Sequence, residues 1–516
     1  TVTILGVVIL LFASVFCYRF LPQGFFPDMN YDQLYVEYKL PEGTNSSRVK
    51  ADLMEIENYL FGRKEITHVT TSIGGTPARY NLVRSIADPS LSYGELIIDF
   101  ATPKDLVTNM KEIQEYLTDM YPDAYVRLKR YNLMYKKYPI ELQFNGPDPV
   151  VLRDLTSQAM EIMRRSSDIF LVNSDWEAKT PVLSVDYNQP VARSIGLSRQ
   201  DVGLSILSAT GGIPTSVFYD GSRSQTIYLK CVDKNGLPIE SIENSPVFSM
   251  LPSMSGIIDR KTIQGLMTGA ISEEDVLESV LKTVPLSQAT HGVKIQWEEP
   301  LVVRYNGQRA MRAQGNPVFG VSVEDARQSI VGEIEQIQLP EGYSMQWEGE
   351  RKASSQAMKY LFANLPLGVI LMIVILIMLF KDYRKPIIIF CCLPLIMIGV
   401  IIGMLVTGKT FGFVAIVGTL GLMGMMIKNG IVLMDEIAMQ IADGAGPVKA
   451  LLDSASSRFR PVIMASMTTI FGMLPLVTDD LFGAGAVAIM GGLLFGTLIT
   501  LFIVPVLYAT FFRIKV

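Results

Sequence analysis

A single lysine inside a long apolar run has the clearest potential for chemistry in this sequence. The run covers residues 411–434 and contains Lys428, followed at once by Asn429. Because ~20 apolar residues are enough to cross the hydrocarbon core of a bilayer, the run predicts a membrane-spanning helix. A lysine near the middle of such a helix costs at least ~2.5–3.5 kcal/mol, so it should face protein and have a partner. Lys428 therefore predicts an ion or proton relay; the alternative is a lysine that snorkels to the headgroups.

Further polar groups lie in or beside the apolar run at residues 461–477. Ser466 and Thr469 fall inside this run, and Arg458 comes just before it. Hydroxyl groups in membrane helices usually bond back to their own backbone or join two helices. That general role is one interpretation of Ser466 and Thr469; the more specific one is that they hydrate Lys428.

No carboxylate lies deep in any of the apolar runs. Asp435 and Glu436 follow the run that contains Lys428, and we expect them to be solvated at the cytoplasmic end of its helix. A buried ammonium group needs an acidic partner, so we expect that partner in another chain or in a part of the protein absent from this sequence. The sequence opens with Thr1 almost directly inside an apolar segment, which we interpret as one half of a duplicated transporter.

Composition and motif content argue against several other classes of function. The 516 residues carry a formal net charge of −5, so binding of nucleic acid is not expected. There is no G-x-x-x-x-G-K-[ST] motif, which argues against direct drive by ATP. The two histidines and four cysteines lack the spacing of a zinc site or a disulfide framework. The sequence predicts no cofactor.

The apolar runs predict an α-helical transmembrane bundle of six spans, one before and five after a large polar domain. The predicted spans are residues 2–21, 361–380, 386–407, 411–434, 461–477 and 487–512. Three basic segments, around Lys381, Arg460 and Arg513, fall on one side of this arrangement. The positive-inside rule makes that side cytoplasmic, so the polar domain is extracytoplasmic.

The polar domain predicts two α+β subdomains of the ferredoxin-like βαβ type. The first has the order strand, helix, strand, strand, helix, strand, at residues 32–40, 46–60, 68–73, 95–100, 104–120 and 124–129. The second has strands at 139–144, 170–174 and 182–187 and a helix at 149–165. Its remaining half is predicted at 315–323, 326–336 and 343–348, which makes residues 188–305 an insertion.

Three motifs, in this order, resemble those of the resistance–nodulation–division (RND) permeases. They are PQGFFPDMNYDQ at residues 22–33, GLMGMMIKNGIVLMDE around Lys428, and RFRPVIMASMTTIFGMLPL at residues 458–476. Over essentially its whole length the chain is similar to the carboxy-terminal half of these permeases, within the branch that exports hydrophobic and amphiphilic compounds.

The resemblance implies a proton-driven antiporter in the bacterial inner membrane, surrounded by lipid, that exports drugs and detergents. It implies a homotrimer that works with a periplasmic adaptor and an outer-membrane channel. In this family a lysine on the tenth helix pairs with two aspartates on the fourth, which assigns the relay to Lys428 with Asn429, joined by Arg458 on the eleventh helix. The aspartates would belong to the amino-terminal half. Ala465 stands where the family often has threonine, and Ser466 or Thr469 would replace that hydroxyl.

The resemblance also assigns a role to each part of the chain. These parts are the first transmembrane helix (1–27), a first porter subdomain (28–135), a second porter subdomain in two pieces (136–188 and 306–355), an inserted docking or funnel subdomain (189–305) and five transmembrane helices (356–516). Tyr80, Leu82 and Tyr93 fall in or beside the segment where the family has a substrate-contacting loop. They are candidates for a substrate pocket, with surface aromatic residues as the alternative.

Two other functions stay open at this point. One is export of heavy-metal ions by another branch of the same superfamily, although the polar domain has no clear methionine cluster beyond Met250 and Met254. The other is a membrane-anchored assembly or translocation subunit that transports nothing, which would need no role for Lys428.

Overall fold

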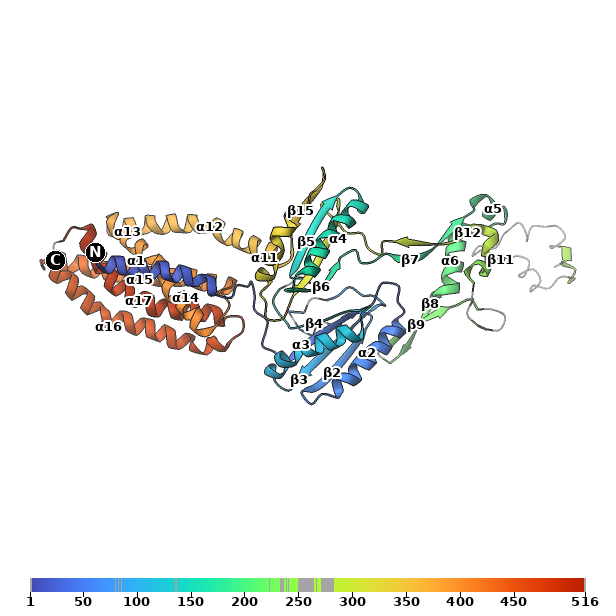
Figure 1. The fold of residues 1–516 in the computed structure, drawn as a ribbon, viewed down its shortest axis with the longest axis horizontal. Coiled ribbons are helices and arrows are strands. Elements are labelled where there is room, and N and C mark those ends of the chain that lie inside the picture. Colours follow the sequence, from blue (N-terminus) through green and yellow to red (C-terminus); the bar gives the residue numbers. More distant parts are fainter. Residues whose placement is uncertain are drawn as a thin grey trace. The chain divides into compact units, whose positions relative to one another are not determined.

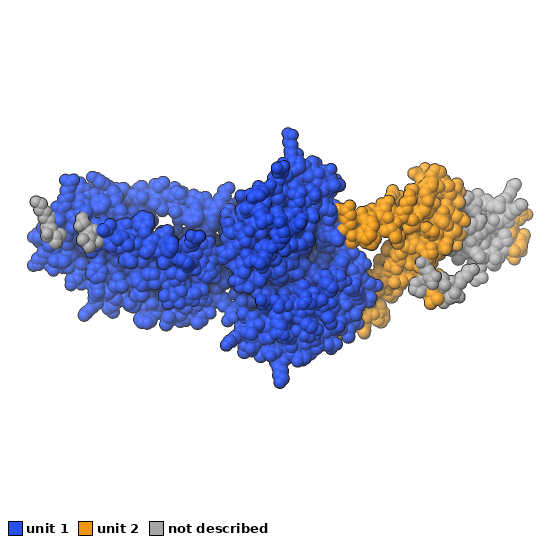
Figure 2. Space-filling view, in the orientation of Figure 1, with its two compact units in different colours: residues 1–178, 300–516 blue, residues 179–299 orange. Residues whose placement is uncertain are grey.

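The structure is a computed structural model that describes residues 2–514, apart from residues 79, 82, 85, 135–136, 222, 233–235, 238, 240, 249–263, 266 and 271–282. Leu82, Met250 and Met254 therefore lie outside the described residues. The chain divides into two compact units (Figure 2). The larger unit joins Thr1–Ala178 to Pro300–Val516, and the smaller one is Lys179–Glu299.

Within the described residues, six helical segments are long and apolar enough to cross a membrane. They contain α1 (Val2–Cys17), η1 (Tyr18–Phe20), α12 (Gly349–Phe380), α13 (Arg384–Cys392), η3 (Leu393–Leu395), α14 (Ile396–Thr407), α15 (Phe413–Ala442), α16 (Pro447–Met473), η4 (Leu474–Thr478) and α17 (Gly483–Phe511). All of them belong to the larger unit.

Two of these helices begin well before the apolar runs that predict them. α12 starts at Gly349 and α16 at Pro447, whereas the apolar runs start at residues 361 and 461. The first turns of α12 are polar, and those of α16 mix apolar residues such as Leu451 with charged and hydroxyl residues, so neither start continues the apolar run. Pro461 consequently lies inside α16 and does not open it. A proline inside a membrane helix is tolerated where neighbouring groups satisfy the freed carbonyl.

Small residues bring the bundle helices α14 and α17 together. A Cβ atom on Gly399 would lie 2.3 Å from the carbonyl oxygen of Gly491, and one on Gly491 would lie 2.6 Å from the carbonyl oxygen of Gly399. Helices in membranes use such contacts because apolar burial alone gives them little drive to associate. On the next residue of α17, Gly492 faces Leu422 of α15, so α17 packs against both neighbours.

The first ferredoxin-like unit has the expected order of strands and helices. It consists of β1 (Gln33–Lys39), α2 (Ser46–Phe61), β2 (Ile66–Ile73), β3 (Tyr93–Phe100), α3 (Pro103–Met120) and β4 (Tyr125–Lys129). The strands form an antiparallel sheet in the order β2-β3-β1-β4, and α2 and α3 cover one face of it (Figure 1). Asn45 and Thr102 cap the two helices, each through a side-chain oxygen that accepts a backbone N–H.

The second ferredoxin-like unit corrects one predicted strand. It consists of β5 (Ile140–Gly146), α4 (Pro149–Arg165), β6 (Ile169–Ser174), β13 (Arg304–Tyr305), β14 (Gln308–Pro317), α11 (Val323–Ile334) and β15 (Ser344–Trp347). The sheet has the order β13-β14-β5-β15, with β6 also paired to β14. The strand predicted at residues 182–187 is therefore wrong for this sheet, and β14 takes its place. In β14, polar residues such as Arg312 and Gln314 interrupt the apolar pattern that would predict a strand. In the strand at 182–187, Val182 and Leu183 produce an apolar pattern although both are exposed.

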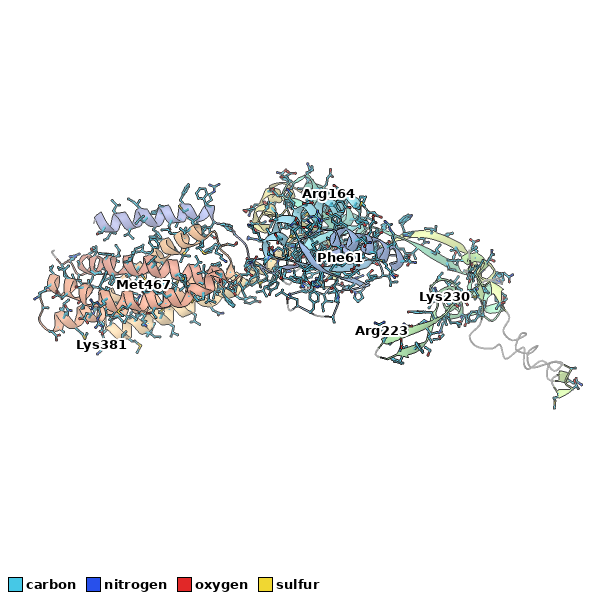
Figure 3. All side chains as sticks on the ribbon, turned by 90° about the horizontal axis from the view of Figure 1, so that it is seen from below. Phe61, Arg164, Arg223, Lys230, Lys381 and Met467 are labelled. Atoms are coloured by element: carbon cyan, nitrogen blue, oxygen red, sulfur yellow. The ribbon has the colours of Figure 1, made fainter. Side chains whose placement is uncertain are left out.

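The smaller unit is built around short helices and two-stranded ribbons. It consists of β7 (Thr180–Tyr187), α5 (Gln189–Ser194), α6 (Arg199–Thr210), β8 (Ile213–Asp220), β9 (Arg223–Leu229), η2 (Ile242–Asn244), β10 (Pro246–Val247), β11 (Val284–Pro285), α10 (Leu286–Ala289) and β12 (Thr290–Glu298). β7 pairs with β12, and β8 pairs with β9 in a hairpin marked by Arg223 and Lys230 (Figure 3). The unit begins at Lys179, somewhat before the predicted insertion.

Candidate functional site

The predicted lysine lies on α15, a helix of 30 residues rich in leucine, isoleucine and methionine. Lys428 is exposed on this helix, and Asn429 is partly buried. Among the residues that the structure describes, none forms a hydrogen bond or ion pair with Lys428. The ammonium group thus faces away from the packed helices of this chain. An ammonium ion in contact with hydrocarbon is unfavourable, so this face of α15 is suited to another protein surface or to water.

Arg458 of α16 is ion-paired with Glu436 of α15. Nε of Arg458 donates to Oε2 of Glu436 over 3.0 Å, and Nη2 of the same guanidinium contacts that oxygen as well. Gln440, one turn along α15, donates to the other carboxylate oxygen over 2.9 Å. Glu436 is therefore paired between two helices, whereas the sequence predicted a solvated carboxylate. It lies about two turns beyond Lys428, at ~12 Å along the helix for a rise of 1.5 Å per residue.

The hydroxyl groups predicted on α16 have different partners. Ser466 is buried and forms a hydrogen bond of 2.8 Å with Thr497 of α17. Thr469 donates to the carbonyl of Ala465 on its own helix over 3.1 Å. Neither hydroxyl contacts Lys428 in the part of the chain that the structure describes. Thr497 was missed from the sequence, although it follows the small residues of α17 that mark a helix contact.

A second polar cluster lies on the sheet of the first ferredoxin-like unit, on the face away from α2 and α3. Glu37 of β1 lies directly opposite Glu95 of β3, and both are almost fully buried. Two carboxylates side by side repel each other, so this arrangement requires cations. Arg84 supplies one from the loop between β2 and β3: its Nη2 lies 2.5 Å from Oε2 of Glu95 and 3.2 Å from Oε1 of Glu37.

Arg127 of β4 supplies the second cation and connects the two ferredoxin-like units. Its Nη2 donates to Oε2 of Glu37 over 2.6 Å, and its Nη1 donates to the side-chain oxygen of Asn316 on β14 over 3.0 Å. Burial alone would raise the pKa of the Glu37 carboxyl, but the surrounding cations, above all Arg127, lower that pKa to about 2. The Glu37 carboxylate therefore stays ionised across physiological pH.

The aromatic residues predicted for a substrate pocket do not share one environment. Tyr93 is buried, and its hydroxyl donates to Oε2 of Glu95 over 2.8 Å, so it belongs to the polar cluster. Tyr80 is 38% exposed, and its hydroxyl lies 2.9 Å from that of Tyr131, which is buried beneath it. Tyr31, also exposed, packs against Tyr131. The exposed rings of Tyr80 and Tyr31 are the part of this group that a ligand could reach.

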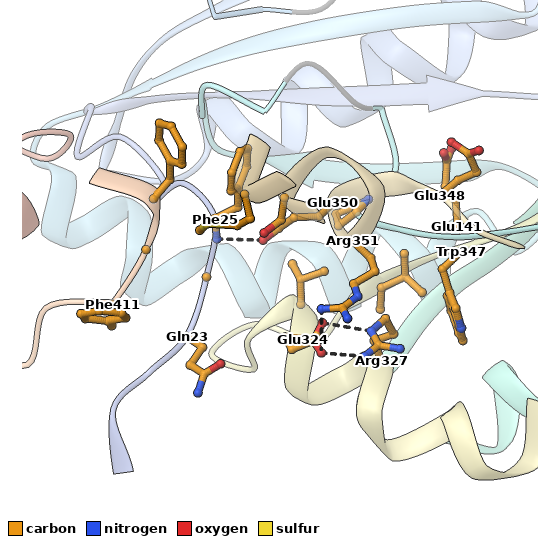
Figure 4. A pocket seen from close by; sticks show the side chains of 18 of the residues that line it. Gln23, Phe25, Glu141, Glu324, Arg327, Trp347, Glu348, Glu350, Arg351 and Phe411 are labelled. Atoms are coloured by element: carbon orange, nitrogen blue, oxygen red, sulfur yellow. Dashed lines mark hydrogen bonds and ion pairs between the residues drawn. The ribbon is translucent and has the colours of Figure 1, made fainter. Parts of the chain in front are cut away.

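A cavity of about 170 Å³ lies where α12 and the start of α15 meet the second ferredoxin-like unit (Figure 4). Charged side chains line it, and Arg327 donates from Nε and Nη2 to the carboxylate of Glu324 over 2.9 and 2.6 Å. The Glu350 carboxylate accepts the backbone N–H of Phe25 at 3.0 Å. Sequence reasoning missed this group because its members are separated by up to several hundred positions. Among the described residues, no cluster of three or more His, Cys, Asp or Glu side chains could hold a metal ion.

A sequence model of the AcrB/AcrD/AcrF family matches residues 1–512, nearly the whole chain. This chain belongs to that family. Two crystal forms of a heavy-metal efflux pump are also similar in structure to it: each has a TM-score of 0.73, 18% sequence identity and 99% of this chain covered. The match covers 51% of the pump chain in one crystal form and 50% in the other, so the chain spans about half the length of these structures.

Membership of the AcrB/AcrD/AcrF family confirms the RND resemblance. Lys428 lies in one of the three motifs on which that resemblance rests. The RND permease fold is confirmed by the structural similarity, with long apolar helices and α+β content. The relay residues and the substrate pocket remain predictions, and they are taken up below as proposals.

Proposed function

We propose that this chain is the carboxy-terminal half of a proton-driven RND antiporter that exports hydrophobic and amphiphilic compounds. The observation that carries the proposal is Lys428, an exposed ammonium group in the middle of a helix long and apolar enough to cross a membrane. Such a group needs an acidic partner inside the membrane. We assign that partner to carboxylates of an amino-terminal half, at the surface where the two halves meet.

The relay works by changing the charge opposite Lys428. When the partner carboxylates are ionised, they attract Lys428; when they take up protons, the attraction is lost and the lysine turns to water or to hydroxyl groups. Asn429 lies beside the lysine and can donate or accept at this surface. Ser466 and Thr469 of α16 are the candidates for hydrating the path, and Arg458 holds α16 to α15 through Glu436.

The same proposal places the protein in the bacterial inner membrane with six spans. The basic segments face the cytoplasm, and the ferredoxin-like units and the smaller unit face the periplasm. The ferredoxin-like units are porter subdomains, with Tyr80, Leu82 and Tyr93 near the substrate path. The smaller unit is a docking subdomain for an outer-membrane channel, in a homotrimer that also binds a periplasmic adaptor.

Export of heavy-metal ions is the second candidate. It is favoured by the similarity to the heavy-metal efflux pump, which at 18% identity extends to the fold alone. A strain without the transporter distinguishes the two: sensitivity to copper or zinc without sensitivity to drugs favours metal export, and the reverse favours export of amphiphiles. A subunit that transports nothing predicts neither sensitivity.

Replacement of Lys428 by methionine tests the proposal. The substitution keeps the length and apolar stem of the side chain and removes its charge. We expect K428M to lower drug tolerance to that of the deletion strain at normal expression. Lys449, exposed in the first turn of α16, provides the matched control K449M, which should keep full tolerance. Unchanged export by K428M would refute the relay.

A further inference from the structure

The segment that follows the first membrane helix is bound to the beginning of α15. We name residues 21–30 the junction segment. Within it, the carbonyl of Pro22 accepts the N–H of Phe411 over 2.8 Å, and the carbonyl of Phe25 accepts the N–H of Phe413 over 3.3 Å. Gln23 and Phe411 also form a short parallel bridge. These backbone bonds fix the first turn of the helix that carries Lys428.

Close packing makes this attachment stiff. A Cβ atom on Gly412 would lie 2.7 Å from the carbonyl oxygen of Gly24, so the two backbones are in direct contact. The rings of Phe25 and Phe413 lie 5.6 Å apart, and Phe25 is almost fully buried. A displacement at the start of α15 must therefore move the junction segment, since there is no space between them to absorb it.

The far end of the junction segment is bound to the first ferredoxin-like unit. Met29 donates its N–H to the carbonyl of Tyr131 over 2.8 Å and accepts a bond of 2.8 Å from Nη2 of Arg130. Asn132 donates from its side chain to the carboxylate of Asp28 over 3.1 Å. All three partners follow directly after β4, so the junction segment connects α15 to the edge strand of the porter sheet.

Glu350 connects the junction segment to the second ferredoxin-like unit. Its carboxylate accepts the N–H of Phe25 over 3.0 Å (Figure 4). Its own N–H donates to the carbonyl of Pro139, just before β5, over 2.9 Å. A second backbone bond supports this attachment: Glu348, two residues before Glu350, donates its N–H to the carbonyl of Glu141 over 2.8 Å. Glu350 thus joins α12, β5 and the junction segment at one point.

We propose that Glu350 is a positioning residue that couples movement of the lysine helix α15 to the second ferredoxin-like unit through the backbone of Phe25, while the junction segment itself carries the movement to the first unit. The proposal rests on the proton-driven export proposed above. Both backbone polar groups of Phe25 are bound: its N–H donates to Glu350, and its carbonyl accepts from Phe413 of α15. When α15 shifts, the Glu350 carboxylate passes the shift to α12 and β5. Without it, α15 can still respond to protons and still move the first ferredoxin-like unit through Met29, but the second unit no longer follows.

Three variants at this position separate a hydrogen-bonding role from a purely electrostatic one. E350A removes the acceptor. E350Q keeps a side-chain oxygen at the same reach without the charge, and E350D keeps the charge but shortens the side chain by one methylene group. The complete transporter, reconstituted in vesicles with a pH gradient, is assayed for proton uptake and for export of an amphiphilic dye. R351A is the control, because Arg351 lines the same cavity but its ion-pair contact, at 3.8 Å, is with Glu324.

We expect E350A and E350D to lower the amount of dye exported per proton at least threefold while proton uptake continues. E350Q and R351A should keep the wild-type ratio. The proposal is overturned if E350A keeps that ratio, or if E350D keeps it and E350Q loses it. Where E350A does not accumulate, the comparison of E350Q with E350D decides alone. K428M in the same assay tests the underlying function separately, because a failure of the relay abolishes proton uptake itself.

Discussion

Arg458 and Glu436 join α16 to α15 through an ion pair in which the guanidinium nitrogen Nε lies 3.0 Å from the carboxylate oxygen Oε2. The two side chains are 34% and 14% exposed, so the pair is only partly shielded from solvent. Its position on the helix of Lys428 makes it a clamp between the helix that carries the relay and its neighbour. An ion pair of this exposure contributes little to stability, about 0–1 kcal/mol.

If the clamp works as a unit, the effects of its two halves on transport are not additive. R458A and E436Q should each lower the export rate several-fold, and the double variant should be no slower than the worse single variant. Export rates at equal protein amounts provide the measurement, with the unfolding midpoint as a check on stability. Rates that multiply in the double variant would show that Arg458 acts separately from Glu436, for example directly in the relay.

The hydrogen bond between Ser466 and Thr497 predicts a small loss of stability in the helix bundle. Hydrogen bonds between membrane helices average about 0.6 kcal/mol and reach about 1.7 kcal/mol. S466A and T497V should each lower the free energy of unfolding by an amount in this range, with a coupling energy in the double variant. T469A is the matched control, since among the described residues Thr469 bonds to the carbonyl of Ala465 in its own helix and to no other helix. A loss of export in S466A that T497V does not share, at the same loss of unfolding free energy, would support a place for Ser466 in the relay.

The carboxylate of Glu37 predicts a loss of stability at acid pH. Its pKa falls from 4.5 to about 2 on folding, so the folded state binds fewer protons than the unfolded chain between these values. Stability from this group is complete above pH 4.5 and is lost as the pH falls toward 2, by an amount on the order of 3 kcal/mol. E37Q should be destabilised by about 3–5 kcal/mol at neutral pH, because Arg127 is left buried without its partner.

The pH dependence of unfolding distinguishes this origin from a general effect of acid. The slope contributed by Glu37 between pH 4.5 and 2 should disappear in E37Q. Glu112 is the control: its side chain is 66% exposed and pairs with Arg63 at the surface, so E112Q should change the free energy of unfolding by less than about 1 kcal/mol. An unchanged slope in E37Q would place the acid-sensitive group elsewhere.

The parts predicted correctly from sequence are those with strong local patterns. Long apolar runs gave the six helical candidates, and the alternation of β1 with the amphipathic pattern of α2 and α3 gave the first ferredoxin-like unit. Helix starts at Gly349 and Pro447 could not be placed by the same rule, because charged and hydroxyl residues in the first turns interrupt the apolar runs. The strand β14 was placed too late, at 315–323, for the related reason that arginine and glutamine interrupt its apolar residues.

Contacts between distant segments could not be predicted. Glu37 and Glu95 are neighbours only because β1 pairs with β3 in one register, and a shift of a single residue would turn them to opposite faces. The same holds for Glu350 and Phe25, which are 325 positions apart. Lys428 was found from sequence because a charge in an apolar run is anomalous by itself, without knowledge of any partner.

Proton uptake by the complete transporter tests the central role of Lys428 most directly. The wild type and K428M, with K449M as control, are reconstituted in vesicles at equal protein amounts, and uptake is followed after a pH gradient is imposed in the presence of substrate. We predict that K428M lowers substrate-dependent proton uptake at least tenfold, whereas K449M stays at the wild-type rate. Wild-type proton uptake by K428M would contradict the relay.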